Sequence, residues 1–236
     1  MTVLYEDAWL LAVDKPAGLL VHPVVREPGP SLIELWRGAR PDAALALAHR
    51  LDRETSGVVL LAKGPRADRY VKQAFAARRV EKSYLAIVHG SPAWETIVCD
   101  VPLARARDAQ LSVRRRADPE GESAVTRFVV RERLGSWTLV QCQPLTGRTH
   151  QLRAHLMHLG HPILGDKLYG RPDDVFLEHQ REGATASVRA AVGFPRQALH
   201  AASITLPHPE GGGRVTIAAP LPEDMAAVLA GEAPRW

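Results

Sequence analysis

Short apolar runs dominate the chain, and Pro, Gly or charged residues separate each run from the next. Short runs rich in Val, Ile, Leu and Thr with such boundaries are typical of β-strands. A polar turn at Gly135-Ser136 between two of these runs predicts a β-hairpin. The expected strands are Val3–Tyr5, Leu10–Val13, Gly57–Lys63, Lys82–Val88, Thr96–Val101, Val125–Arg131, Trp137–Gln143 and Ala202–Leu206.

A few segments instead repeat apolar residues every three or four positions, which predicts amphipathic helices. In the second of these segments Thr149 is the expected N-cap, and Gly160 follows the expected end. Strands with interspersed helices predict one α+β domain, residues 1–236, around a mainly antiparallel mixed sheet. The expected helices are Ser31–Trp36, Pro65–Arg78, Thr149–Leu159 and Val175–Arg181.

The composition is that of an ordinary globular protein, with 46% hydrophobic and 24% charged residues. The formal charge of +4 permits a basic face toward a polyanion but does not establish one. Cys99 and Cys142 lie far apart with no CxxC pair, which makes a disulfide framework improbable. With no secretory leader and no long apolar run, the expectation is a soluble cytoplasmic protein.

The segment His49–Gly57 carries five ionisable residues in nine and leads directly into an apolar strand. As an ordinary charged turn, it would use Asp52 or Thr55 to cap backbone groups, and Gly57 would adopt a special dihedral angle. The functional reading is that Asp52, flanked by arginines at the mouth of a buried strand, stays ionised and acts as a nucleophile or base.

The helix that begins near Thr149 places Arg153 roughly opposite its leucines, so Arg153 faces whatever packs on the polar side. Its Thr-Gly-Arg start, which includes Arg148, is also suited to bind an anion. An amphipathic helix whose arginine pairs with a surface acid is the alternative. On the strand Val80–Val88, Tyr84 is either a packing residue or a flat surface for a nucleobase.

Four histidines between His150 and His161 raise the question of a metal site. No two of them are four residues apart, and no glutamate lies between them, so the spacing argues against a zinc motif. The sequence also lacks GxGxxG, GxxxxGK[ST] and GxSxG motifs, which disfavours dinucleotide-dependent and nucleotide-hydrolysing enzymes.

Six segments, in order along nearly the whole chain, resemble the RluA-type family of RNA pseudouridine synthases. The resemblance implies a curved, mainly antiparallel mixed sheet with flanking helices and a central cleft, and an isomerase that needs neither cofactor nor metal. The run HRLDRETSG is the most specific of the matching pieces. The segments are Asp14–Pro23, His49–Gly57, Lys82–Tyr84, Thr146–His155, Gly160–Asp166 and Leu199–Ala201.

By this resemblance, Asp52 attacks a flipped-out uridine or its ribose, or only promotes elimination, and the sequence does not decide between these. Arg153 pairs with that carboxylate, and Tyr84 lies against the target base. Base flipping is required because the glycosidic bond is inaccessible within a stack. Arg50 matches an arginine that enters the RNA where the base has left. Arg148 and Lys15 are expected phosphate contacts.

Many family members carry an N-terminal S4-like RNA-binding module, whereas here the first catalytic strand begins within five residues of Met1. The expectation is therefore a monomer without an S4 domain that binds an rRNA or tRNA stem-loop through its catalytic domain. The arginine-rich loop Arg105–Arg116, above all Arg114, Arg115 and Arg116, is the expected contact with phosphate.

The sequence leaves two rival functions open. One is a metal-dependent hydrolase built on the histidines, and the other is a non-catalytic RNA-binding protein. The set Asp52, Tyr84 and Arg153 argues against the second, because a binder needs no carboxylate beside a phosphate backbone.

Overall fold

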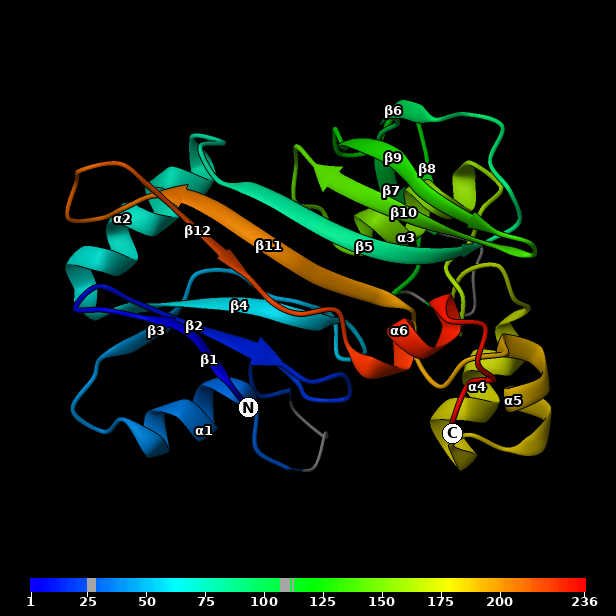
Figure 1. The fold of residues 1–236 in the computed structure, drawn as a ribbon, viewed down its shortest axis with the longest axis horizontal. Coiled ribbons are helices and arrows are strands. Elements are labelled where there is room, and N and C mark those ends of the chain that lie inside the picture. The colour runs from blue at the N-terminus through cyan, green and yellow to red at the C-terminus, as the bar shows by residue number, and fades with distance from the viewer. Residues whose placement is uncertain (25–28, 107–110, 112) are drawn as a thin grey trace. The chain divides into compact units, whose positions relative to one another are not determined.

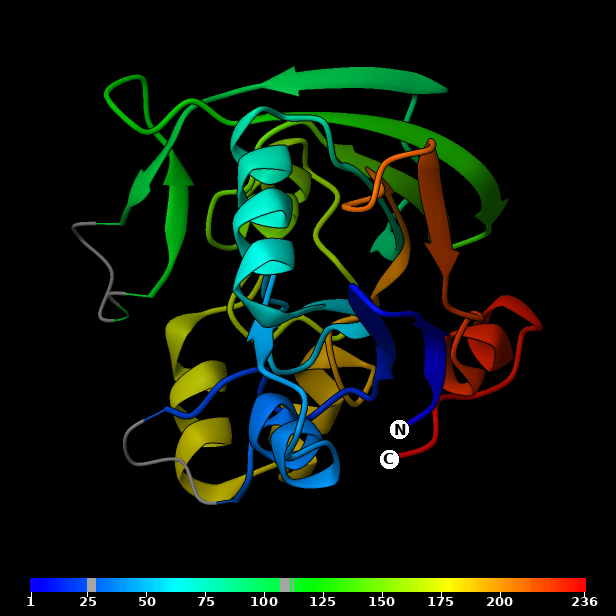
Figure 2. The same cartoon turned by 90° about the vertical axis from the view of Figure 1, so that its left-hand side faces the viewer.

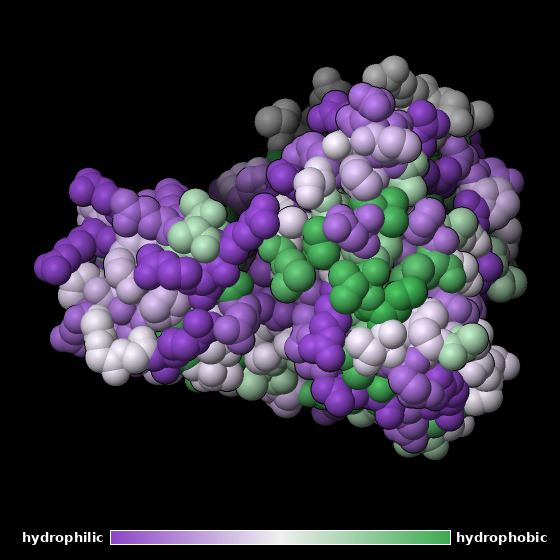
Figure 3. All heavy atoms as spheres, turned by 90° about the horizontal axis from the view of Figure 1, so that it is seen from above, coloured by the Kyte–Doolittle hydropathy of each residue, from purple (hydrophilic) through white to green (hydrophobic). Residues whose placement is uncertain are grey.

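The computed structural model describes residues 1–24, 29–106, 111 and 113–236. Two compact units make up the chain, and Figure 1 gives the position of each element along it. Unit 1 comprises residues 1–82 and 200–220, and unit 2 comprises residues 83–199 and 221–236. The face shown in Figure 3 carries mainly hydrophilic side chains, with the largest apolar area near its middle. No helix among the described residues is long and apolar enough to cross a membrane.

Unit 1 is built on a mixed sheet in which β2 and β4 are buried on both faces. β4 pairs antiparallel with β2 and β3 and parallel with β11, while β1 and β12 pair antiparallel with β2 and β11. Burial on both faces explains why these two strands are continuous apolar runs rather than alternating ones. The strands are β1 (Val3–Glu6), β2 (Leu10–Lys15), β3 (Leu45–Leu47), β4 (Ser56–Lys63), β11 (Leu199–Pro207) and β12 (Arg214–Ala218).

Two helices accompany this sheet, α1 (Leu32–Ala39) and α2 (Gly64–Ala76). The small apolar stripe of α2, Ala67, Val71 and Ala74, packs in one core cluster with side chains of β2, β4 and β11. Figure 2 shows α2 as the upright cyan helix. Ser31 begins α1 with a capping box to Glu34, whose carboxylate accepts from the Ser31 backbone N–H at 2.8 Å.

Unit 2 contains an antiparallel sheet in the order β5-β10-β9-β6 and a separate two-stranded hairpin, β7–β8. β9 and β10 form the hairpin that the sequence predicts around Gly135-Ser136. The strands are β5 (Glu81–His89), β6 (Thr96–Asp100), β7 (Leu103–Arg105), β8 (Arg115–Ala117), β9 (Val125–Leu134) and β10 (Trp137–Pro144).

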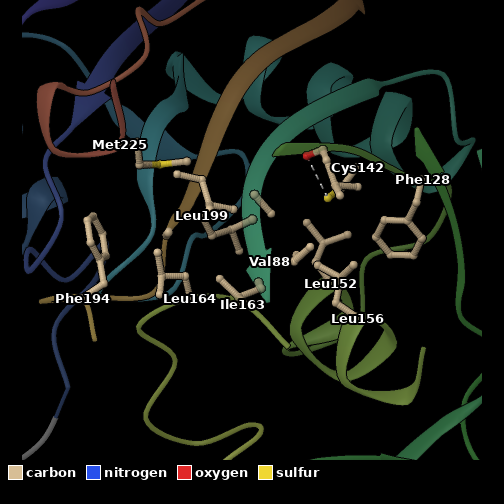
Figure 4. Packing of buried hydrophobic residues seen from close by; sticks show 14 of the residues in the cluster. Val88, Phe128, Cys142, Leu152, Leu156, Ile163, Leu164, Phe194, Leu199 and Met225 are labelled. Atoms are coloured by element: carbon tan, nitrogen blue, oxygen red, sulfur yellow. Dashed lines mark hydrogen bonds between the residues drawn. The ribbon is translucent and has the colours of Figure 1, made fainter. Parts of the chain in front are cut away.

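The core of unit 2 lies between this sheet and α3, with Phe128, Leu152 and Leu156 packed together (Figure 4). Leu199 and Met225 extend the same cluster to the C-terminal helix. The helices are α3 (Gln151–His158), α4 (Asp173–Glu182), α5 (Ala186–Val192) and α6 (Glu223–Leu229).

The α+β class and the mainly antiparallel mixed sheet are confirmed, and each predicted strand and helix is present within a few residues. The Thr149 cap is wrong: α3 is preceded by His150 in the left-handed conformation, with φ of 55°, and no side chain caps it. The single-domain assignment stays a prediction. The short strands β3, β7, β8 and β12 and the helices α5 and α6 were not predicted.

Candidate functional site

Asp52 lies in unit 1, in a turn between β3 and β4. The backbone N–H of Thr55 donates to the Asp52 carbonyl at 3.1 Å, which closes the turn. Leu51 and Thr55 are buried on either side, whereas Asp52 is half-buried. The turn therefore anchors its neighbours in the protein and leaves the carboxylate partly accessible.

Lys15 ties this turn to the segment that follows β2. Its fully buried ammonium donates to the carbonyls of Pro16, Leu19 and Arg53 at 2.9, 2.8 and 2.9 Å. Gly18 adds a backbone donor to the Arg53 carbonyl at 2.8 Å, and the Arg53 Nε donates back to the Gly18 carbonyl at 3.1 Å. This environment does not fit the phosphate contact predicted for Lys15, because a buried ammonium bonded to three carbonyls cannot reach solvent. Its role is to fix the Asp52 turn.

His49 anchors the start of the same segment as a neutral ring. Its Nε2 accepts from the backbone N–H of Leu60 on β4 at 3.1 Å, and its ring lies 5.7 Å from that of Phe75 on α2. Burial, followed by the positive charge of Lys82, lowers the pKa of His49 to about 4. An imidazole that accepts from an amide must be unprotonated at that nitrogen, so geometry and charge agree.

The end of the segment packs against β11 within unit 1. Gly57 has φ of 107°, and a Cβ there would lie 2.3 Å from the Ala201 carbonyl oxygen. Only glycine satisfies both conditions, which confirms the special dihedral predicted for Gly57. Next to it, the buried Ser56 hydroxyl lies 3.0 Å from His200 Nδ1.

Arg153 lies in unit 2, on α3, and is buried rather than presented on an open polar face. Its Nε and Nη2 donate to the two oxygens of Asp166 at 2.7 and 2.9 Å, and the Asp166 side chain is 0% exposed. Asp166 also accepts from the backbone N–H groups of Leu168 and Tyr169 at 2.9 and 3.0 Å. The two backbone bonds hold the Asp166 carboxylate, and its fork of two bonds to Arg153 fixes the plane of the guanidinium.

The Tyr169 ring contacts the same guanidinium, with the Arg153 Cζ 5.1 Å from the ring centroid. The Tyr169 hydroxyl accepts from the backbone N–H of Arg115 at 2.8 Å and lies 3.2 Å from His150 Nδ1. Tyr169 thus connects Arg153 to the hairpin β7–β8. The contact with Tyr169 also gives the left-handed His150 a tertiary role.

Tyr84 lies on β5 in unit 2, opposite Cys142 on β10, and is half-buried against the core. It shares a strand face with Ala86, as the alternation predicts. Its partly exposed ring is compatible with either of the two roles expected from the sequence.

The candidate RNA contacts lie in different surroundings. Arg50 is exposed in the Asp52 turn, and the guanidinium of Arg148 bonds Glu122 at 2.7 Å and the Ser123 carbonyl at 3.0 Å. Arg115 and Arg116 lie on β8 rather than in the expected loop, because β8 pairs with β7. The loop's Arg107 lies outside the described residues.

Two of the histidines in and near α3, His155 and His161, serve structural roles. Buried His155 accepts from or donates to the Thr126 hydroxyl at 3.0 Å, and its Nε2 lies 2.9 Å from the Val101 carbonyl. His161 lies 3.0 Å from the His89 carbonyl through Nδ1. Among the described residues, no three His, Cys, Asp or Glu side chains gather as a metal site requires.

Two residues of this arrangement, Asp166 and Tyr169, were not predicted as functional. Asp166 lies in a matching segment, but no role was predicted for it from the sequence. The signal that points to both is the run Gly165-Asp166-Lys167-Leu168-Tyr169-Gly170 directly after an arginine-bearing helix.

Comparison with known proteins gives a consistent result. The family model described as RNA pseudouridylate synthase matches residues 9–158. Ribosomal large subunit pseudouridine synthase D of Xanthomonas campestris is 38% identical over 234 residues, which are 97% of this chain and 68% of that protein. Ribosomal large subunit pseudouridine synthase C of Escherichia coli K12 is 39% identical over 235 residues, 96% of this chain and 68% of that protein.

Two solved human structures share the fold. RNA Pseudouridylate Synthase Domain Containing 4 superimposes with a TM-score of 0.74 at 28% identity, covering 99% of this chain and 94% of that one. RNA Pseudouridylate Synthase Domain Containing 1 gives a TM-score of 0.77 at 25% identity, covering 99% and 88%.

Proposed function

Since the chain belongs to the RNA pseudouridylate synthase family, we propose that it isomerises uridine to pseudouridine in RNA with Asp52 as the catalytic carboxylate. The observation that carries the assignment of Asp52 is its turn. The contacts of Lys15, His49 and Gly57 fix the backbone of the segment at three points, while the Asp52 carboxylate itself stays partly accessible. A held but accessible carboxylate is what attack at a sugar or base carbon requires.

The reaction is an internal rearrangement whose atoms balance without a co-reactant. The bond between N1 of the base and C1′ of the ribose breaks, the base rotates, and a bond forms between C5 and C1′. The proton on C5 leaves, and N1 gains one. The uridine must leave the stack before any of these atoms can be reached.

Arg153 is the proposed partner of the Asp52 carboxylate. The pair with Asp166 uses the Nε–Nη2 edge of the guanidinium, and a guanidinium has a further donor edge with which it can hold a second carboxylate. An adjacent guanidinium keeps a carboxylate ionised and oriented. In the same proposal, Tyr84 lies against the extruded base and assists removal of the C5 proton.

The proposed substrate is a stem-loop of ribosomal or transfer RNA, bound by a monomer. The relatives' names support ribosomal RNA, since both are ribosomal large subunit pseudouridine synthases. Arg50, exposed in the catalytic turn, fills the position that the flipped base vacates. Arg148 and the arginines of β8 contact phosphates.

Replacement of Asp52 by Asn or Ala tests the catalytic assignment. Pseudouridine formation in total RNA, mapped with and without the protein, should disappear with either variant, while RNA affinity should remain within about threefold of the wild type. Asp42→Asn is the matched control, an exposed carboxylate of the same unit outside the turn. Retained product with Asp52→Ala would refute the role of Asp52, and absent product from the wild type would favour a non-catalytic RNA-binding protein.

The proposed phosphate contacts have a separate test. Changing Arg114, Arg115 and Arg116 together to Gln should weaken RNA binding and flatten its salt dependence, because fewer counterions are released. Unchanged affinity and salt slope would remove β8 from the RNA interface without touching the assignment of Asp52.

A further inference from the structure

Unit 2 contains a pocket of about 550 Å³ beside the hairpin β7–β8. Residues of β8, of α3 and of the chain from Leu168 to Pro172 form its walls. This volume lies within the range of roughly 300–1,000 Å³ that is usual for small-molecule sites. It is therefore large enough to hold a single nucleotide.

The rim of the pocket is basic. Arg114, Arg115, Arg116 and Arg171 line it together with His158, and the described lining residues include no acidic side chain. The neighbouring carboxylates pair with two of these arginines from outside, Asp173 with Arg114 at 2.6 Å and Asp118 with Arg116 at 3.4 Å. The remaining positive charge suits an anion.

Arg114 supplies a more specific signal. Its Nη1 bonds Asp173, but its Nε and Nη2 are buried and have no hydrogen-bond partner among the described residues. Buried guanidinium donors without acceptors are unfavourable, and native structures normally provide acceptors for them. A phosphate oxygen in the pocket would accept from both nitrogens in the fork geometry that arginine offers.

The floor of the pocket is apolar. Ala154, Met157, Leu168 and Tyr169 form it, and Met157 is 43% exposed although it is a large hydrophobic side chain. The Tyr169 ring also contacts the Arg153 guanidinium, whose Cζ lies 5.1 Å from the ring centroid. An aromatic ring beside an exposed thioether offers a sequence-tolerant surface for a flat base.

We propose that this pocket binds one extruded nucleotide of the RNA substrate, other than the target uridine, with its phosphate on the arginine rim and its base on the floor of Met157 and Tyr169. The inference rests on the proposed function only for the identity of the ligand as RNA. Phosphate contacts on the rim set the register of the strand, and the apolar floor distinguishes an extruded nucleotide from a stacked one.

The three methionines of the chain allow a local test that does not depend on catalysis. Protein that carries Asp52→Asn is labelled with ¹³C at the methionine methyl groups and titrated with uridine 5′-monophosphate, inorganic phosphate, uridine, or an RNA stem-loop. Met157→Leu assigns the pocket signal, and fully buried Met225 serves as the internal reference. The Met157 signal should shift with the mononucleotide and with the stem-loop, and less with phosphate or uridine alone.

Side-chain changes then test the arginine rim of the pocket. Arg171→Gln should weaken the binding of the stem-loop about tenfold and lower its salt slope by roughly 0.7 for one phosphate contact in a single strand. Arg133→Gln is the matched control, an arginine of the same unit paired with Glu95 at 2.8 Å outside the pocket. Asp173→Asn should strengthen binding, because it releases Arg114 toward phosphate. A purely structural clamp predicts lower stability with no gain in affinity.

Two results would overturn the inference. One is a Met157 signal that stays unchanged when the stem-loop is saturating by fluorescence anisotropy. The other is a shift with the mononucleotide but not with RNA, which would make the pocket a site for free nucleotides. Both readings are independent of pseudouridine formation, so they separate failure of this inference from failure of the proposed function.

Discussion

The pair between Arg153 and Asp166 makes a prediction that separates stability from catalysis. Asp166→Asn keeps the volume of the side chain but removes its charge and replaces one acceptor oxygen with a donor. The Asp166 oxygens accept four bonds, at 2.7, 2.9, 2.9 and 3.0 Å, and the side chain is 0% exposed. At least one guanidinium N–H would then face an amide N–H.

Removing one partner of a buried ion pair costs roughly 3–5 kcal/mol, because the other charge stays desolvated. We therefore expect urea denaturation to show a loss of that size in the free energy of unfolding for Asp166→Asn. Single-turnover pseudouridine formation should fall as well, because the Arg153 guanidinium loses at least one of the two bonds to Asp166 that orient it.

Asp224→Asn is the matched control, since Arg196 forks onto Asp224 at 2.6 and 2.9 Å in the same unit. The Asp224 side chain is 37% exposed, so water can reach the Arg196 donors that lose the carboxylate, and the guanidinium keeps its bonds to the Gln197 and Leu199 carbonyls at 3.0 and 3.2 Å. The expected loss is therefore about 1 kcal/mol or less. Equal losses for the two variants would refute the reasoning from burial. The double variant Arg153→Met with Asp166→Leu should recover much of the stability but none of the activity, because a buried pair can be replaced by apolar groups.

Three further predictions follow from unit 1. Burial lowers the pKa of His49 to about 4, below its ordinary value of 6.5. Between these two pH values the unfolded chain binds a proton that the folded chain does not, so the free energy of unfolding should fall by roughly 3 kcal/mol as the pH drops through that window. His49→Gln, followed by denaturation at several pH values, should flatten this dependence; an unchanged slope would exclude His49 as its source. Gly57→Ala should lower the thermal midpoint sharply, since the new Cβ would lie 2.3 Å from the Ala201 carbonyl oxygen, whereas Gly38→Ala, with open space around it, should not. Lys15→Met should cost about 2 kcal/mol or more of unfolding free energy, because three carbonyls lose their donor. In the folded protein the salt slope of RNA binding should stay unchanged. A lower slope would restore Lys15 as a phosphate contact.

Local patterns predicted most of the secondary structure because hydrophobic periodicity is a property of neighbouring residues. The long strands β4, β9 and β10 and the helix α2 carry clear periods, and each lies close to its predicted range. The short strands that were missed are stabilised by pairing rather than by their own residues. Three residues of β8 become a strand only because β7 lies beside them.

The ordered motifs of the chain were sufficient to predict the family and to nominate Asp52, Tyr84 and Arg153. The tertiary structure decided what surrounds Asp52 and Arg153, because the residues that hold these surroundings in place are distant along the chain. Lys15 bonds a carbonyl 38 residues away, and the Arg115 backbone bonds a tyrosine hydroxyl 54 residues away.

At Lys15 the sequence interpretation considered the charge of the side chain without its burial, and it therefore predicted a contact with RNA phosphate. Burial reversed that expectation, because a desolvated ammonium is stable only with hydrogen-bond acceptors around it, and here three carbonyl oxygens provide them. At Arg153, one alternative from the helical wheel was a pair with a surface acid. The structure shows a pair with Asp166 instead, and the Asp166 side chain is buried. The sequence by itself nominated the residues proposed to carry the chemistry, and only the fold decided which charges are buried, since burial depends on segments that no local pattern brings together.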